Sequence, residues 1–179
     1  TEDQCVTGKC LRFDGTDDYV SMGDVLDMNT TDTTTLEAWV KTTNTSLDYM
    51  GVISKWDADA GCGNNDKQSY SMHVRSNGKI GTTVNSDGGE DNSVTASTAI
   101  NDGKWHFIAV TIADGSNNYN IYVDGKNDYT GTKSGTGILA STTTLKVGLL
   151  DPDCAGLANR VFAGQIDEPS ASMPCKSHC

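Results

Sequence analysis

The sequence predicts an all-β protein, a sandwich or a barrel built from many short strands. Short runs of residues alternate between apolar and polar side chains, which is the period of a strand with one buried face. Helical periodicity is nearly absent, and turns built from Asp, Asn and Gly separate the runs. The dipeptide Asp-Gly, which suits tight hairpins, occurs at residues 14–15, 87–88, 102–103, 114–115 and 124–125.

Each predicted strand is rich in β-branched and aromatic residues, and its alternation indicates which side chains point inward. In the run that starts at Trp105, for example, Ile108, Val110 and Ile112 share one face. The predicted strands, in chain order, are Leu11–Phe13, Tyr19–Met22, Leu36–Thr42, Val52–Trp56, Tyr70–Arg75, Lys79–Val84, Trp105–Ile112, Tyr119–Asp124, Leu145–Gly148 and Val161–Asp167.

Length and charge narrow the classes of function. A chain of 179 residues suits one domain, and its net charge of −11 with only 13 basic residues argues against nucleic acid as a partner. The same charge disfavours an anionic membrane surface and favours divalent cations. No apolar run is long enough to span a bilayer, so we expect no direct membrane insertion.

Six cysteines outside any redox motif indicate an oxidising compartment, so we expect an extracellular, secreted protein. Two glycosylation sequons, Asn29-Thr30-Thr31 and Asn44-Thr45-Ser46, fit an extracellular surface. No signal peptide is visible, which is expected of a mature form or an excised domain.

Motifs in a fixed order cover roughly residues 10 to 168. They are Leu11–Val20, Thr35–Val40 with Glu-x-Trp at its centre, Gly51–Trp56 followed by Tyr70–Met72, Gly103–Thr111, Ile121–Lys126, Leu145–Gly148 and Phe162–Glu168. In this order and spacing they resemble the bacterial laminin G-like, concanavalin A-like domains. The most specific piece is Gly103-Lys104-Trp105-His106-Phe107-Ile108-Ala109-Val110-Thr111.

The resemblance implies a disulfide-stabilised jelly-roll sandwich of two antiparallel sheets, with the first and last strands adjacent. Residues 1–179 then form a single domain with its core at about 10–168 and cysteine-bearing tails at 1–9 and 169–179. The tail departs from the family, because residues 169–174 interrupt the last regular segment with two prolines. We therefore expect the usual last strand to be lost and a disulfide-anchored tail to replace it.

The resemblance also implies which cysteines meet. Cys62 lies in a long loop, Asp57–Lys67, and Cys154 lies in a second one, Leu149–Asn159. These loops are neighbours at one end of the resembled fold, so Cys62–Cys154 is the expected pair. The four remaining cysteines lie near the two termini, and both local and crossed pairings stay open for them: Cys5, Cys10, Cys175 and Cys179.

The same two loops carry the candidate calcium ligands. A Cys62–Cys154 bridge would gather carboxylates whose mutual repulsion a calcium ion relieves. The expected ligands are Asp57, Asp59, Asp66, Asp151 and Asp153. The alternatives are plain solvated loops, or a competing site at the paired terminal strands made of Asp14, Asp18 and Asp167.

Carbohydrate recognition needs aromatic platforms beside polar groups. Four residues around the first long loop are the candidates: Trp56, Asn64, Asn65 and Tyr70. We expect the other two tryptophans, Trp39 and Trp105, to pack the sandwich or cover a sheet.

Catalysis is not expected. Sandwich glycoside hydrolases use two carboxylates from one strand, and the nearest match is Gln165-Ile166-Asp167-Glu168-Pro169-Ser170, with Gln and Ser where carboxylates are needed. Family members are chiefly carbohydrate-binding, adhesive or protein-binding modules, so we expect a binding module for a glycan or an extracellular surface protein. The alternative is a structural, self-associating subunit of an extracellular filament, pilus-like appendage or coat, without a small ligand.

Overall fold

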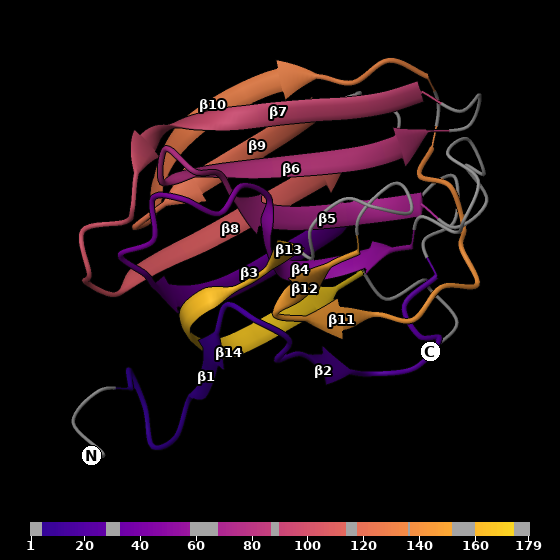
Figure 1. Ribbon diagram of the computed structural model, residues 1–179. Coiled ribbons are helices and arrows are strands. Elements are labelled where there is room, and N and C mark those ends of the chain that lie inside the picture. Colours follow the sequence, from indigo (N-terminus) through magenta and orange to yellow (C-terminus); the bar gives the residue numbers. More distant parts are fainter. Residues whose placement is uncertain are drawn as a thin grey trace.

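The protein is a sandwich of two six-stranded antiparallel sheets (Figure 1). The computed structural model describes residues 5–27, 33–57, 68–86, 90–113, 118–135, 137–151 and 160–173. Sheet I has the order β1 (Leu11–Asp14), β14 (Ala163–Ser172), β3 (Thr34–Lys41), β8 (His106–Ala113), β9 (Asn118–Val123) and β10 (Lys126–Thr132). Sheet II has the order β2 (Val20–Ser21), β11 (Lys146–Val147), β4 (Met50–Trp56), β5 (Gln68–Val74), β6 (Lys79–Ser86) and β7 (Glu90–Ala99).

A third, small sheet pairs β12 (Leu149–Leu150) with β13 (Arg160–Val161). The predicted sandwich is therefore confirmed, and the first and last strands are adjacent, since Leu11 of β1 lies opposite Ile166 of β14. The described part contains no helix long and apolar enough to cross a membrane.

The core lies between the two large sheets. Alternate residues of each strand point into it, as in β3, where the burial of successive side chains alternates along the whole strand. The largest wholly buried side chains of this core are Tyr70, Tyr119, Phe162, Leu36, Met50, Met72, Ile80, Ile100 and Ile108.

The short β12 falls in the predicted loop Leu149–Asn159, and two strands of the large sheets, β7 and β10, are also absent from the predicted strands. Each of these two is the last strand of its sheet, and each is dominated by Ser, Thr, Asn and Asp instead of apolar residues. An edge strand covers little of the core, so its sequence lacks the apolar alternation by which the other strands are recognised.

The expectation that the last strand is lost is wrong. Strand β14 runs through Pro169 to Ser172, because a bulge between Asp167 and Ser170 takes the proline out of the pairing with β3. At the bulge Glu168 adopts a positive φ of 47°.

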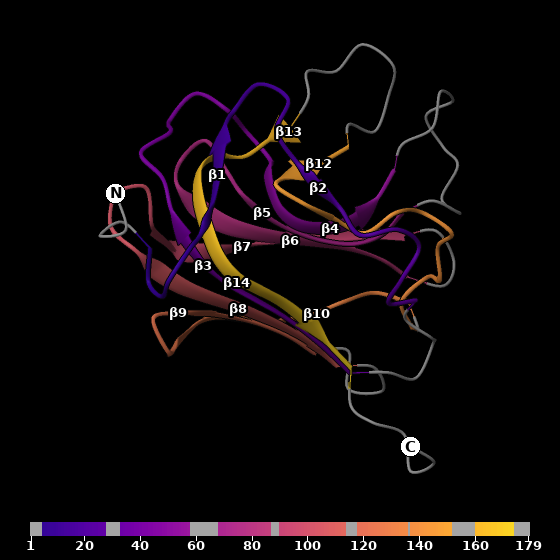
Figure 2. The same ribbon diagram turned by 90° about the horizontal axis from the view of Figure 1, so that it is seen from below.

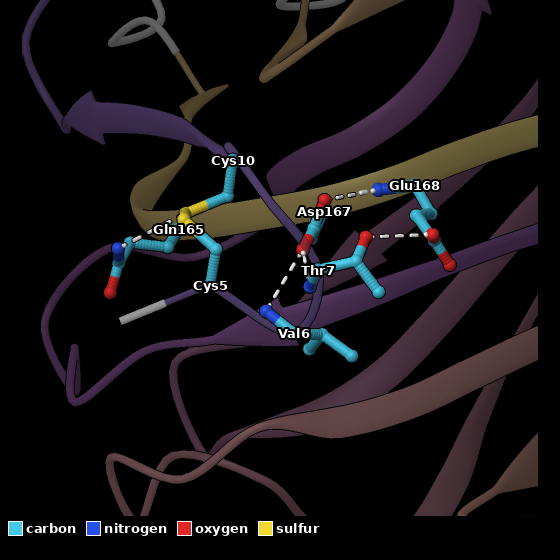
Figure 3. The surroundings of a disulfide bond; sticks show 7 residues. All are labelled: Cys5, Val6, Thr7, Cys10, Gln165, Asp167 and Glu168. Atoms are coloured by element: carbon cyan, nitrogen blue, oxygen red, sulfur yellow. Dashed lines mark hydrogen bonds between the residues drawn. A yellow bond between two sulfur atoms is a disulfide. The ribbon is translucent and has the colours of Figure 1, made fainter. Parts of the chain in front are cut away.

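The N-terminal segment is tied down beside this bulge (Figure 3). Cys5 and Cys10 form a disulfide, so the local pairing is confirmed for these two cysteines and their crossed pairing is wrong. The buried Asp167 carboxylate accepts hydrogen bonds from the backbone nitrogens of Val6 (2.9 Å) and Thr7 (3.1 Å). Asp167 is therefore a structural acceptor for the N-terminal segment.

The two polar edge strands are joined by one carboxylate. Asp128 of β10 accepts hydrogen bonds from the backbone nitrogens of Ser97 (2.6 Å) and Thr98 (2.8 Å) of β7, and from the Thr98 hydroxyl (2.6 Å). Burial raises the pKa of Asp128, but the hydrogen bonds from Thr98 and Ser97 outweigh it and the pKa is lowered. This contact closes one side of the sandwich.

Replacing Asp128 with Ala should lower the free energy of unfolding by about 1–2 kcal/mol, because three bonds to a charged acceptor are lost. Urea denaturation at neutral pH measures the change. Asp17→Ala removes an exposed carboxylate elsewhere and is the matched control. An equal loss in both variants would contradict the closing role of Asp128.

His106 provides a second test of the electrostatics. Its Nδ1 lies 2.8 Å from Asp124 and its Nε2 lies 3.0 Å from Asp102. Burial lowers the pKa of His106, but the hydrogen bonds to Asp124 and Asp102 prevail and the pKa is raised above the ordinary 6.5. Because the pKa of His106 is higher in the folded protein than in the unfolded chain, protonated His106 stabilises the fold. This stabilisation is complete at pH values below the pKa of the unfolded chain, and it is lost as the pH rises through the pKa of the folded protein.

Wild-type protein should therefore exceed His106→Gln in unfolding free energy by about 0.5–1 kcal/mol near pH 5.5, and the gap should close near pH 8.5. Urea midpoints of both proteins at the two pH values provide the comparison. A gap that is constant or grows with pH would show that His106 does not act through its charge.

Candidate functional site

The outer face of sheet II brings together segments that are far apart in the sequence. Strands β12 and β13 lie on the side of sheet II that faces away from sheet I (Figure 2). Ser54 of β4 donates a hydrogen bond to the Leu149 carbonyl (2.6 Å), and a β-carbon at Gly51 would overlap the backbone of Leu149 and Leu150. The short β12 therefore crosses β4 at van der Waals distance, and beside it Thr83 of β6 and Ser93 of β7 stay accessible on the outer face of sheet II.

A row of hydroxyl groups crosses this outer face. The register places Ser54 opposite Ser71, Ser71 opposite Thr83, and Thr83 opposite Ser93, so one hydroxyl comes from each of four adjacent strands. The Thr83 hydroxyl donates to Ser93 Oγ over 3.3 Å. Ser54 and Ser71 are wholly buried, so the accessible part of the row is Thr83 and Ser93, which come from neighbouring strands about 4.8 Å apart.

Three members of the row line a pocket of about 140 Å³, which we call the sheet II groove. Its walls come from the end of β4, from β12 and β13, and from the residue before β4. The lining residues are Tyr49, Trp56, Ser71, Thr83, Ser93, Leu150 and Arg160. Trp56 is the last residue of β4, Leu150 the last of β12 and Arg160 the first of β13, so segments far apart in the sequence meet at this groove.

Tyr49 is held between charged and aromatic groups. The guanidinium carbon of Arg75 lies 3.9 Å from the centre of its ring, that of Arg160 lies 4.6 Å away, and the His73 ring centre lies 4.9 Å away. Tyr49 also adopts a positive φ of 57°, which is unfavourable for a bulky residue and is found mostly where function requires it. Cation–π contacts with two guanidinium groups fix the ring at the wall of the groove.

Asp48 orients this stack. It accepts two hydrogen bonds from Arg75, over 2.7 and 3.0 Å, and a third from the Ser76 backbone nitrogen over 2.9 Å. The hydrogen bond from Arg75 lowers the pKa of Asp48, so the pair stays charged at neutral pH. The planar, two-bond geometry leaves Arg75 little freedom to leave the Tyr49 ring.

His73 lies beneath Tyr49 as a neutral, buried ring. Desolvation, helped by the charges of Arg75 and Arg160, lowers its pKa to about 3. Nδ1 lies 3.3 Å from Ser71 Oγ, while the buried Nε2 has no hydrogen-bond partner among the residues that the structure describes. Nε2 points at Gly81, and any β-carbon there would overlap the imidazole. A buried polar atom without a partner is uncommon and marks this face as specialised.

Two of the expected calcium ligands do lie close to one amine. Lys146 forms an ion pair with Asp151, and burial lowers the pKa of Lys146 while the charge of Asp57 opposes that shift. The ends of the two acidic loops therefore flank a lysine ammonium. Three other expected ligands, Asp59, Asp66 and Asp153, lie outside the described residues.

The competing set of Asp14, Asp18 and Asp167 is not brought together. Asp14 lies opposite Ala163 in β14, four residues before Asp167, which is a separation of about 13 Å along a strand. Within the described ranges, carboxylates that lie close enough to share an ion are the exposed Asp14, Asp17 and Asp18.

The predicted sugar platform is wrong for Tyr70. Its side chain points into the core with 0% exposure, and its hydroxyl donates to the Leu26 carbonyl over 3.2 Å. Trp56 lines the groove but is only 3% exposed, so it forms a wall and offers no open ring face. Asn64 and Asn65 lie outside the described residues, as do Cys62, Cys154, Cys175 and Cys179.

Sequence reasoning missed most of the groove. Tyr49 and Arg160 belong to no motif, and the hydroxyls of Ser71, Thr83 and Ser93 look like ordinary outward positions of half-buried strands. The sequence does carry one indication of this site: the outward positions of β5 and β6 that pair with each other are Ser71 with Thr83 and His73 with Gly81, all of them small or polar residues.

Replacing Gly81 with Ala should lower the free energy of unfolding by about 1–3 kcal/mol, because the added methyl group overlaps the buried His73 ring. Urea denaturation measures this loss. The double variant Gly81→Ala with His73→Ala should lose less than the sum of the two single variants. Strict additivity would mean that the two residues do not press on each other.

Comparison with known proteins agrees with this architecture. The family model for the concanavalin A-like lectin/glucanases superfamily matches residues 14–171. A native heptameric SAP-like pentraxin from Limulus polyphemus is similar at a TM-score of 0.61 and 15% identity, covering 89% of this chain and 73% of that one. No curated protein matches the chain.

Two similar structures are carbohydrate complexes. One is the CBM40 of the Ruminococcus gnavus IT-sialidase bound to α2,3 sialyllactose, with a TM-score of 0.62 and 11% identity over 91% of this chain and 90% of that one. The other is domain 4 of AbnA, an extracellular arabinanase from Geobacillus stearothermophilus, in complex with arabinotriose, with a TM-score of 0.62 and 16% identity over 94% and 72%. At these identities the likeness shows the fold.

Proposed function

The chain belongs to the concanavalin A-like lectin/glucanases superfamily, and we propose that it is an extracellular carbohydrate-binding module that holds a glycan in the sheet II groove. The observation that carries the proposal is the pair of accessible hydroxyls on Thr83 and Ser93 beside the fixed ring of Tyr49. Sugars present alternating hydroxyl groups and apolar ring faces, so a polar floor with a rigid aromatic and guanidinium wall suits them.

Two features support a site that is formed before the ligand arrives. Asp48 and the cation–π contacts immobilise Tyr49 and Arg75, and Gly51 and Gly81 let the backbone and His73 pack closely behind the groove. A rigid site spends little of its binding free energy on ordering side chains. The sialyllactose and arabinotriose complexes of similar folds support a saccharide as the ligand class.

Binding without cleavage is the second part of the proposal. Hydrolysis of a glycosidic bond needs two carboxylates on opposite sides of that bond. The described residues that line the groove include neither Asp nor Glu, and Asp167 is occupied by the N-terminal segment on the other sheet. These positions support a binding module.

A calcium contribution is part of the proposal only through the two acidic loops. Asp57 and Asp151 flank Lys146 of β11, and additional loop carboxylates would shift the balance there toward a cation. Repeating each binding measurement after chelation separates calcium-assisted binding from binding by protein groups alone.

The proposal predicts that Thr83→Val abolishes or weakens glycan binding by about tenfold, because a groove hydroxyl is replaced by a methyl group of equal size. A glycan array on the wild-type protein identifies the oligosaccharide, and calorimetry with that oligosaccharide measures the loss. Arg160→Gln should weaken binding as well, since it removes one wall of the groove.

The matched control is Thr35→Val, the same exchange on the outer face of sheet I, which should bind as the wild type does. Thr83→Val and Thr35→Val should keep the wild-type melting temperature, whereas Arg160→Gln also removes a cation–π contact with Tyr49 and should lower it. Failure of the wild type to bind any oligosaccharide on the array, or equal weakening by Thr35→Val, would rule the groove out as a glycan site.

A further inference from the structure

A larger hollow lies on the outer face of sheet I, on the opposite side of the molecule from the sheet II groove. It has a volume of about 450 Å³, within the usual range for small-molecule sites. Strands β1, β14 and β3 form its floor, and the segment from Thr42 to Asn44 that follows β3 forms a wall. We call it the sheet I pocket.

Two cations flank this pocket. The register places Arg12 of β1 opposite Gln165 of β14, and Gln165 opposite Lys41 of β3. Phe13, the neighbour of Arg12, is buried in the core, so Arg12 points outward with Gln165 and Lys41. Two strand spacings separate the backbones of Arg12 and Lys41 by about 10 Å. Long side chains across that gap can reach one ligand group between them.

Arg12 and Lys41 have no carboxylate partner among the described residues, whereas four other basic residues do. Lys55, Lys104, Lys146 and Arg75 each form an ion pair with an aspartate. Neither Arg12 nor Lys41 forms one with any residue in the described ranges. In a chain with a net charge of −11, two cations that stand together without a carboxylate partner form a local positive site.

The rest of the pocket offers neutral hydrogen-bonding groups. Thr42 is fixed, since its hydroxyl donates to the Ala163 carbonyl (2.6 Å) and accepts from the Asn44 backbone nitrogen (3.0 Å). Asn44 Oδ1 accepts from the backbone nitrogens of Ser46 (2.9 Å) and Leu47 (2.8 Å), which leaves its amide nitrogen as a donor. This wall suits uncharged hydroxyl groups of a ligand.

Asp14 limits the charge that the pocket tolerates. It lines the end of the pocket, and its carboxylate lies within 4.8 Å of those of Asp17 and Asp18. A second negative charge on the ligand would meet this acidic group. The geometry therefore favours a ligand with one anionic group at the Arg12 and Lys41 end and neutral hydroxyls elsewhere.

We propose that the sheet I pocket is a second binding site, for a sugar that carries a single carboxylate, of the hexuronic acid class. The Arg12 guanidinium matches the planar carboxylate with two parallel hydrogen bonds, and the Lys41 ammonium adds a point charge. The Gln165 amide nitrogen lies 3.4 Å from Cys10 Sγ, and its amide oxygen accepts hydrogen bonds from the sugar hydroxyls. The site shares no residue with the sheet II groove and does not depend on the proposed function.

Titration of the whole protein with glucuronic acid, followed by backbone amide NMR, tests the site. The amides of Thr42, Thr43, Asn44 and Gly103 should shift with saturation, while the methyl ester of glucuronic acid should leave them unchanged. Arg12→Gln and Lys41→Gln should each weaken binding by about tenfold. Arg12→Lys should keep part of the affinity, since it keeps the charge but not the fork.

Lys126→Gln is the matched control, because Lys126 is exposed at the start of β10 and should not affect the titration. A digalacturonate should bind no tighter than the monoacid, since Asp14 repels the second charge. Equal binding of acid and ester, an equal effect of Lys126→Gln, or no shift in the wild type at millimolar ligand would overturn the proposal. Thr83→Val should leave this titration unchanged, which separates it from a failure of the sheet II groove.

Discussion

The crossing of β12 over the outer face of β4 is the contact on which the candidate site depends. It buries both faces of β4, so that every residue from Met50 to Trp56 is shielded from water. A strand buried on both faces must satisfy its polar groups locally, and Ser54 does so by donating to the Leu149 carbonyl. The same crossing stops short of β6 and β7, and the step between covered and uncovered strands is the sheet II groove.

Packing behind the groove is achieved by residue size. Gly51 admits the β12 backbone, and Gly81 admits the His73 ring, which in turn supports Tyr49. The positive φ of Tyr49 persists because two guanidinium groups and the imidazole hold the ring from different elements. The wall of the groove is thus determined by contacts among strands β4, β5 and β13, and not by the loop that contains it.

Charge is distributed unevenly over this acidic molecule. Lys55 is buried and forms ion pairs with Asp24 (2.6 Å) and Asp27 (2.8 Å), so it anchors the segment before β3. Lys146 serves the same purpose beside the two acidic loops. Arg12 and Lys41, by contrast, form no ion pair within the described residues and both line the sheet I pocket. The sheet I pocket therefore carries two cations, whereas the floor of the sheet II groove carries neutral hydroxyl groups.

Alternation and turn chemistry predict an all-β sandwich or barrel and the inward side chains of β3 and β8, whereas the two packed sheets and the adjacency of β1 and β14 are what the family resemblance implies. The features predicted by alternation depend on period-two patterns and tight turns, which are local in the sequence. The polar edge strands β7 and β10 could not be recognised, because Asp128 joins them through a contact between residues 30 apart in the chain.

The functional residues divide along the same line. The sequence by itself determined the strand faces, the acidic composition and the absence of a carboxylate dyad, since these follow from residue types at short spacing. Only the tertiary structure decided that Tyr70 faces the core, that β14 passes through Pro169 on a bulge, and that Tyr49, Thr83 and Arg160 meet. Sites on the outer faces arise where strands and crossings from distant segments come within contact distance, and such distances are not encoded in any one segment.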